Sequence, residues 1–245
     1  MSIYRNTILA ALAISCMFSC TKETPYLQGD IVGFVSTVDE DGMITDDQGG
    51  VFVKAASKTD SAETYTDETG KFVLTNLNFG QYTINLDKEG YGGTIHYSIF
   101  DHVGGSQPTF FEKLSIYKIS SKSAKLDSIS ITPSGQGFTM QVEGEINGEL
   151  NRNIGVHLVF LIGENNVSKD NYIKYQSLIV YENPFKEIIV FFDDEIQESF
   201  SNQDNYKIVV YTSNRSVGGF LDQASNKFVF PCLGEPSNVL EFAFK

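Results

Sequence analysis

Apolar and polar residues alternate along much of the chain beyond residue 28. The clearest example is the stretch 138–146, where apolar side chains or glycine stand at every second position. These positions are Phe138, Met140, Val142, Gly144 and Ile146. Because successive side chains of a strand point to opposite faces, this pattern predicts a strand with one buried and one solvated face. The sequence therefore predicts an all-β fold.

The first half of the chain predicts one β-sandwich over residues 29–119. Its short strand-like runs are Asp30–Val38, Val51–Ala55, Tyr82–Leu86, Ile95–Ile99 and a final run at 110–119. Turn residues separate these runs. The segment Asp67-Glu68-Thr69-Gly70 predicts a hairpin loop between strands at 64–66 and 71–74, with Gly70 at a positive φ.

The second half predicts another β-sandwich over residues 124–245. Its strand-like runs are 125–132, 138–146, 156–162, 172–181, 187–192, 206–212, 227–230 and 239–244. Turn signals separate them, the last at Gly234–Pro236. Short strands at this spacing are typical of an immunoglobulin-like or fibronectin type III-like sandwich. Asp194–Ser199 is the one helix candidate, and a polar turn would fit it equally well.

A series of turn and core residues in the first half carries a family resemblance. It comprises Gly29-x3-Gly33, Gly50-Val51-x-Val53, Thr66-Asp67-x2-Gly70-Lys71-Phe72-x-Leu74, Leu77-x2-Gly80-x-Tyr82 and Glu89-Gly90-Tyr91. This series resembles the carboxypeptidase regulatory-like domain over about Asp30–Tyr91. The resemblance implies a transthyretin-like β-sandwich in which Phe72 and Tyr82 fill the core. It implies no catalytic residues, because members of the family are accessory modules.

Residues 1–19 predict a secretory signal peptide. Arg5 supplies a positive charge, and Thr7–Phe18 is an apolar run too short to span a bilayer. Ser19-Cys20 followed by Thr21-Lys22-Glu23 resembles the cleavage site of bacterial lipoproteins of the Bacteroidota type. This resemblance implies a lipid on Cys20, palmitate among its acyl chains, and a tether over residues 20–28. It implies attachment to the cell outer membrane with surface exposure.

Cys16 is the competing lipidation site. Cleavage before Cys16 would leave an apolar segment of about eight residues, at the short end for a signal peptide. It would also leave Met17 and Phe18 in the tether, whereas the residues that follow Cys20 are polar. These two differences favour Cys20. A plain secreted protein with incidental cysteines is the remaining alternative.

The net charge excludes one class of partner. The chain carries a formal charge of −13 with 18 Lys and Arg against 31 Asp and Glu. Removal of residues 1–19 takes away Arg5 alone, so the remaining chain has 17 − 31 = −14. DNA and RNA backbones would repel such a surface, so we expect no nucleic-acid partner.

The sequence offers few groups for catalysis. Nucleophile-elbow, zincin and phosphate-loop motifs are all missing from the sequence, so we expect a non-enzyme without cofactor or metal. His96 and His102, with Asp101 beside His102, would form a catalytic or metal site only if they converged in a pocket. His157 is expected to be a satisfied strand histidine, and Cys232 a buried small apolar residue.

Acidic residues gather in two places. Asp39, Glu40, Asp41, Asp46 and Asp47 crowd the region 39–47, where either a calcium site or a solvated turn would fit. Their spacing lacks the EF-hand pattern, which favours the turn. Asp193-Asp194-Glu195 follows an apolar strand and is expected to end it.

Aromatic residues gather at the end of the first half. These are Tyr91, Tyr97, Phe100, Phe110 and Phe111, and they form a candidate ligand face. The alternative is that they fill the first core or cover the seam between the two sandwiches. Exposed aromatic rings would suit a glycan, although the chain has no Trp.

Together these features predict a non-catalytic lipoprotein of the cell envelope that serves as a binding or scaffolding accessory at the outer membrane. One alternative is a carbohydrate-binding component of a glycan-uptake system. Another is a structural or adhesin subunit, which would require an unpaired edge strand and self-association. The partners expected are the membrane, through the lipid, and a glycan or protein at the cell surface.

Overall fold

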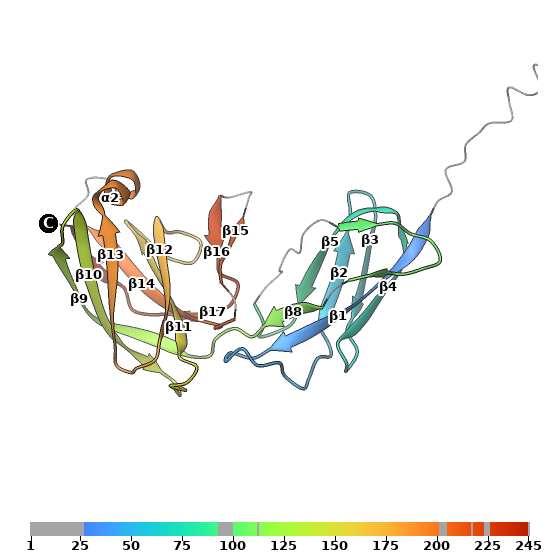
Figure 1. Ribbon diagram of the computed structural model, residues 1–245, viewed down its shortest axis with the longest axis horizontal. Coiled ribbons are helices and arrows are strands. Elements are labelled where there is room, and N and C mark those ends of the chain that lie inside the picture. The colour runs from blue at the N-terminus through green and yellow to red at the C-terminus, as the bar shows by residue number, and fades with distance from the viewer. Residues whose placement is uncertain are drawn as a thin grey trace, which may run out of the picture.

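The structure is a computed structural model that describes residues 27–92, 100–111, 113–200, 205–216, 218–222 and 226–244. Figure 1 shows the strands gathered into two groups that follow one another along the long axis of the molecule. The predicted all-β fold of two tandem sandwiches is therefore confirmed. Among the described residues, no helix is long and apolar enough to cross a membrane.

The N-terminal sandwich consists of two four-stranded sheets. In one sheet β1 (Gln28–Val38) pairs with β4 (Lys71–Asn78), β7 (Thr109–Phe110) and β8 (Leu114–Tyr117). In the other the order is β3 (Ser61–Tyr65), β2 (Phe52–Ala56), β5 (Gly80–Asp87) and β6 (Phe100–His102). Alternate side chains of each sheet, among them Phe72, Tyr82 and Val53, are buried between the two, as the pattern predicted.

Two sequence predictions about this sandwich were wrong in detail. The turn at Asp67–Gly70 is no hairpin, because β3 pairs with β2 while β4 pairs with β1 in the opposite sheet. The turn is a corner between sheets, and Gly70 does adopt a positive φ of 80° there. The predicted strand at 110–119 is divided into β7 and β8, which both pair with β1 in parallel.

The C-terminal sandwich is built from a three-stranded and a five-stranded sheet. The first consists of β13 (Phe185–Phe192), β10 (Gly137–Asn147) and β9 (Ser123–Pro133). The second consists of β12 (Lys174–Val180), β11 (Val156–Gly163), β14 (Tyr206–Ser213), β17 (Leu233–Pro236) and β18 (Leu240–Phe242). All eight residues of β11 are buried, because this strand lies between two neighbours and under the facing sheet. The only helix in the described ranges is α2 (Asp193–Ser199), where the sequence placed its helix candidate.

The end of the chain departs from the prediction. Residues 227–230 contribute β16 (Lys227–Val229), which pairs only with β15 (Phe220–Asp222) in the described part of the chain. The sandwich strand is instead β17, at the position predicted as the turn Gly234–Pro236. Gly234 serves close approach and not chain reversal, since a Cβ there would lie 2.7 Å from the Ser120 carbonyl oxygen. Pro236 is tolerated at the end of this strand.

A polar joint connects the two sandwiches. Asn214, fully buried at the end of β14, donates from Nδ2 to the carbonyl oxygens of Asp39 (2.7 Å) and Lys118 (3.1 Å). Its Oδ1 accepts the backbone N–H of Ser216 at 2.9 Å. One side chain from the C-terminal sandwich thus satisfies two carbonyls of the N-terminal sandwich.

The segment between the sandwiches is held from both sides. Glu40 accepts the backbone N–H of Ser121 (2.9 Å) and lies 3.5 Å from the Lys122 ammonium. On the other side, Thr212 Oγ1 donates to the carbonyl oxygen of Lys122. Nearby, Gly92 packs so closely on Cys232 that a Cβ would lie 2.3 Å from Sγ. A linker held by both neighbours favours a fixed angle between the sandwiches over free hinge motion.

Candidate functional site

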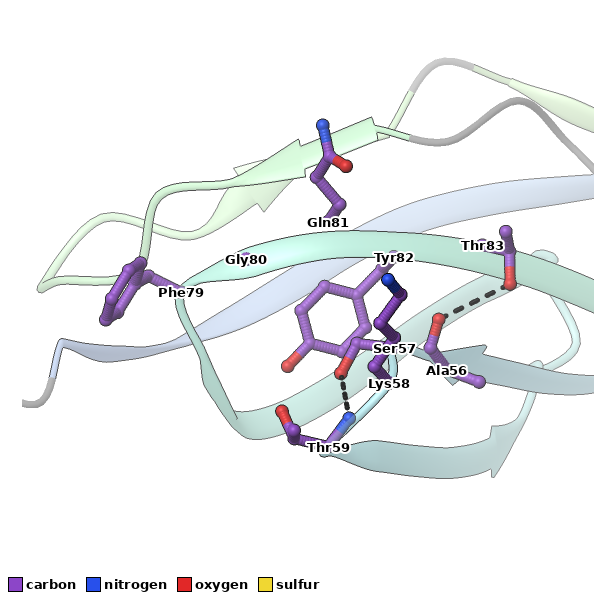
Figure 2. A pocket seen from close by; sticks show the side chains of 9 residues that line it. All are labelled: Ala56, Ser57, Lys58, Thr59, Phe79, Gly80, Gln81, Tyr82 and Thr83. Carbon is purple, nitrogen blue, oxygen red and sulfur yellow. Dashed lines mark hydrogen bonds between the residues drawn. The ribbon is translucent and has the colours of Figure 1, made fainter.

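A shallow groove of about 510 Å³ lies at the end of the N-terminal sandwich that is remote from the joint (Figure 2). The turn between β2 and β3 and the start of β5 form it. Its lining residues are Ala56, Ser57, Lys58, Thr59, Phe79, Gly80, Gln81, Tyr82 and Thr83. Ser57 fixes the turn, because its Oγ accepts the backbone N–H groups of Thr59 (3.3 Å) and Asp60 (2.9 Å).

Tyr82 and Asp60 form a hydrogen-bonded pair behind this groove. The Tyr82 hydroxyl lies 3.0 Å from Asp60 Oδ2, and the same oxygen accepts the backbone N–H of Asn78 at 2.9 Å. The Asn78 N–H, together with the Tyr82 hydroxyl, lowers the pKa of Asp60. Burial and the neighbouring Asp60 raise the pKa of Tyr82. Both shifts move the pKa away from neutral pH, so neither group is suited to exchange protons there.

Exposed apolar side chains surround the same end of the sandwich. Leu27, Phe79 and Val103 are 44%, 57% and 68% exposed. Backbone hydrogen bonds bring the three segments that carry these residues together. Phe79 N donates to the Leu27 carbonyl oxygen (2.9 Å), and Gly105 N, in the loop after Val103, donates to the Gln28 carbonyl oxygen (2.9 Å). We call Leu27, Phe79 and Val103 the apolar tip. It lies where the described chain begins, about 33 Å along β1 from the joint.

Of the two histidines that would have to converge in a pocket to form a site, the structure describes only His102, which has a role within the fold. His102 is buried in β6 and not in a loop, because β6 pairs with β5. Its Nε2 donates to the Leu77 carbonyl oxygen (3.2 Å), and its Nδ1 accepts from the Thr109 hydroxyl (2.7 Å). The adjacent Asp101 is exposed on the other face of the strand. His96 lies outside the described residues.

His157 and Cys232 occupy structural positions, as expected. His157 is buried in β11 with Nδ1 3.4 Å from the Asn214 carbonyl oxygen, and burial lowers its pKa. Cys232 is fully buried, and burial raises the pKa of its thiol to about 12. A thiol with such a pKa is unreactive at neutral pH.

The acidic region 39–47 is engaged with protein groups. Asp39 Oδ1 accepts the backbone N–H groups of Asp41 (3.0 Å) and Met43 (2.8 Å). Asp47 Oδ2 lies 3.2 Å from the Lys88 ammonium. Within the described residues, no three His, Cys, Asp or Glu side chains converge as metal ligands. Asp193, Asp194 and Glu195 form the first turn of α2, where negative charge favours the helix dipole.

Four of the five aromatic residues of the candidate ligand face are described, and they lie in different surroundings. Phe100 and Phe111 meet edge to face, with ring centroids 4.4 Å apart, and both pack against the first core. Tyr91 also packs on that core, beneath the Lys88 ammonium at 5.3 Å from its ring centroid. Phe110 is 73% exposed. Tyr97, like the lipidation candidate Cys20, lies outside the described residues.

Phe110 belongs to an apolar row that the sequence analysis missed. In the sheet register Val32 of β1 is opposite Phe110 on one side and opposite Val73 of β4 on the other. Phe34, two residues along β1 on the same face, is also exposed. The outer face of this sheet therefore presents apolar side chains to solvent, and an apolar residue at alternate positions of β1 was the available signal.

No protein-family model and no curated protein matches the sequence. Among solved structures, the chain is similar to a DUF3823 family protein from Bacteroides ovatus, with 10% identity, 89% and 100% of the two chains covered, and TM-score 0.28. It is also similar to a Bacteroides uniformis protein provisionally described as carbohydrate-binding, with 11% identity, coverages of 88% and 98%, and TM-score 0.30. A third is the major pilin subunit BcpA of Bacillus cereus, with 11% identity, coverages of 87% and 68%, and TM-score 0.33. Such values support no statement about function.

Proposed function

We propose that this protein is a lipid-anchored, non-catalytic accessory of the bacterial outer membrane that acts as a rigid arm. The observation that carries the proposal is the polar joint centred on Asn214, which ties the two sandwiches together at the end opposite to the start of β1. A lipid on Cys20 would hold the apolar-tip end near the membrane. The C-terminal sandwich would then stand away from the membrane, available to a glycan or protein partner at the cell surface.

The chemistry of the described residues supports a role without catalysis. His102 and His157 form hydrogen bonds within the fold. The buried thiol of Cys232 contacts the Tyr117 carbonyl oxygen. The contact between Tyr82 and Asp60 lowers the pKa of Asp60 and raises that of Tyr82, in both cases away from neutral pH. A regulatory-like identity for the N-terminal sandwich agrees with this role and is part of the proposal.

The anchor is tested by metabolic labelling with a palmitate analogue. Wild-type protein is compared with Cys20→Ala and with the matched variant Cys16→Ala, and intact cells are treated with protease. We expect label in wild type and in Cys16→Ala, none in Cys20→Ala, and removal of the labelled protein by protease. Label that is lost only in Cys16→Ala would show that the lipid is on Cys16 and not on Cys20. An unlabelled wild type would refute the proposal.

A second candidate function is that of a self-associating structural subunit. Strand β13 is at the edge of its sheet, where its only partner among the described strands is β10. Its outward side chains Ile188, Val190 and Phe192 are exposed. An exposed apolar edge strand favours pairing with a second chain. A monomer by light scattering at high concentration would exclude this function. A dimer that is lost in Val190→Lys would support it.

A further inference from the structure

We propose that the apolar tip of Leu27, Phe79 and Val103 rests on the lipid bilayer, so that the N-terminal sandwich stands end-on upon the membrane. This inference rests on the proposed anchor at Cys20 and adds to it a defined contact surface. The proposed partner of the tip is a lipid surface. Neither a soluble protein nor a second copy of the chain is expected there.

The short tether supplies the first argument. Only seven residue steps separate Cys20 from Leu27. At full extension seven steps reach about 25 Å at most. A lipid on Cys20 would thus confine Leu27, and with it the tip, to the vicinity of the membrane surface.

The composition of the tip supplies the second argument. Its three side chains come from three separate connections: the residue before β1, the β4–β5 turn and the loop after β6. All three are exposed. Lys58 lines the same groove as Phe79 (Figure 2), and its ammonium would be available to lipid headgroups. Exposed apolar side chains with a cation in the adjacent groove suit the interface of a bilayer.

Tethering makes so small a contact effective. Three partly inserted side chains would hold a free protein on a membrane only weakly. A protein already attached by its lipid meets the surface at a high local concentration, so a weak contact is sufficient to orient it. The tip would therefore fix the tilt of the arm rather than supply the attachment.

The absence of tryptophan from the chain allows a direct test. The lipid-modified protein carrying Phe79→Trp is placed in vesicles of phosphatidylethanolamine and phosphatidylglycerol with brominated acyl chains. The matched control is Gln136→Trp, because Gln136 is exposed in the turn between β9 and β10, at the far end of the C-terminal sandwich. A second tip variant, Val103→Trp, shows whether the result depends on a local change caused by the substitution at position 79.

We expect bromolipids to quench both tip variants severalfold more than the control, with a shift of their emission to shorter wavelength. Equal quenching at both ends, or none at the tip, in protein whose mass shows the lipid would overturn the inference and leave the anchor intact. Protein whose mass shows no lipid would refute the anchor and the inference together. An emission shift that needs no lipid and grows with protein concentration would assign the tip to a second copy of the chain.

Discussion

The two ends of the N-terminal sandwich are closed in different ways. At the end where β1 finishes, Glu40 pairs with Lys122 and accepts the Ser121 N–H, and Asn214 donates to the backbone of the N-terminal sandwich. At the end where β1 begins, Leu27, Phe79 and Val103 extend into solvent beside an open groove. Hydrogen bonds between polar groups are directional, so they are satisfied in one arrangement of the two sandwiches. Apolar side chains are stabilised by any contact that removes them from water, whatever its geometry.

This difference indicates which surfaces serve the fold and which remain for a partner. A buried amide such as that of Asn214 is costly unless every hydrogen bond is made, so a fixed joint follows from its presence. Exposed apolar residues at a turn contribute little to folding. Substitutions at the joint should therefore reduce stability, and substitutions at the tip should leave stability unchanged.

Asn214→Ala should have the largest effect. The substitution leaves the carbonyl oxygens of Asp39 and Lys118 without their donor in a buried site, which should cost about 3 kcal/mol of unfolding free energy. Urea unfolding followed by circular dichroism measures it. The exposed Asn147 gives the matched variant Asn147→Ala, expected to change stability by less than about 0.5 kcal/mol. Equal effects at the two positions would mean that the joint is not a fixed structure.

Gly92→Ala should have the next largest effect. The new Cβ would lie 2.3 Å from Cys232 Sγ and 2.5 Å from the Pro231 carbonyl oxygen, so the sandwiches must separate slightly. We expect a loss of about 2 kcal/mol in the same urea experiment. Gly218→Ala is the control, because nothing lies within 4 Å of its added Cβ. A neutral Gly92→Ala would show that the close approach of the sandwiches does not contribute to stability.

The contribution of Glu40 should depend on pH. Burial opposes its charge, but the hydrogen bonds from Ser121 and the charge of Lys122 outweigh burial and lower the pKa of Glu40 from its ordinary value of 4.5. A carboxylate with a depressed pKa in the folded state stabilises fully above its unfolded pKa and loses that contribution as pH falls through the folded pKa.

Glu40→Gln should therefore be about 1 kcal/mol less stable than wild type at pH 7. The difference should shrink as the pH falls below 4.5. Urea unfolding of the two proteins over a pH series separates this group from the other carboxylates, which titrate in both. A difference that stays constant down to pH 3 would contradict the assignment of the stabilisation to the charge of Glu40.

The tip should give the smallest effect on stability. Phe79→Ser and Val103→Ser alter exposed side chains, so each should change the unfolding free energy by less than about 0.5 kcal/mol. Thermal unfolding of the soluble chain without residues 1–20 suffices for this measurement. A large loss for either variant would mean that the tip belongs to the core, and that a role toward a partner is not needed to explain it.

The strands were predictable where one face is buried. Met140 and Val142 in β10, and Ile84 and Leu86 in β5, were identified because alternation is a direct consequence of a strand with one face in the core. The partner of each strand was less predictable. Asp67–Gly70 marks a change of direction, but its residues do not specify whether the next strand joins the same sheet or the opposite one.

The candidate site was not predictable from local sequence. Leu27, Phe79 and Val103 are separated by more than twenty residues each and meet only because three connections end at the same place. Asn214 was overlooked for the same reason, since its partners Asp39 and Lys118 are far away in sequence. Gly234 was misinterpreted because a glycine for close approach and a glycine for a turn look alike in sequence.

The measurement that tests the rigid arm most directly is the distance distribution between spin labels at its two ends. Thr59→Cys, beside the groove, and Gln136→Cys, in the turn after β9, supply exposed sites in the protein without residues 1–20. The remaining cysteine, Cys232, is buried with a pKa of about 12 and should not react with the label. We expect one narrow distribution that broadens in Asn214→Ala. A broad distribution in the otherwise wild-type protein would show two freely hinged sandwiches and would contradict the account.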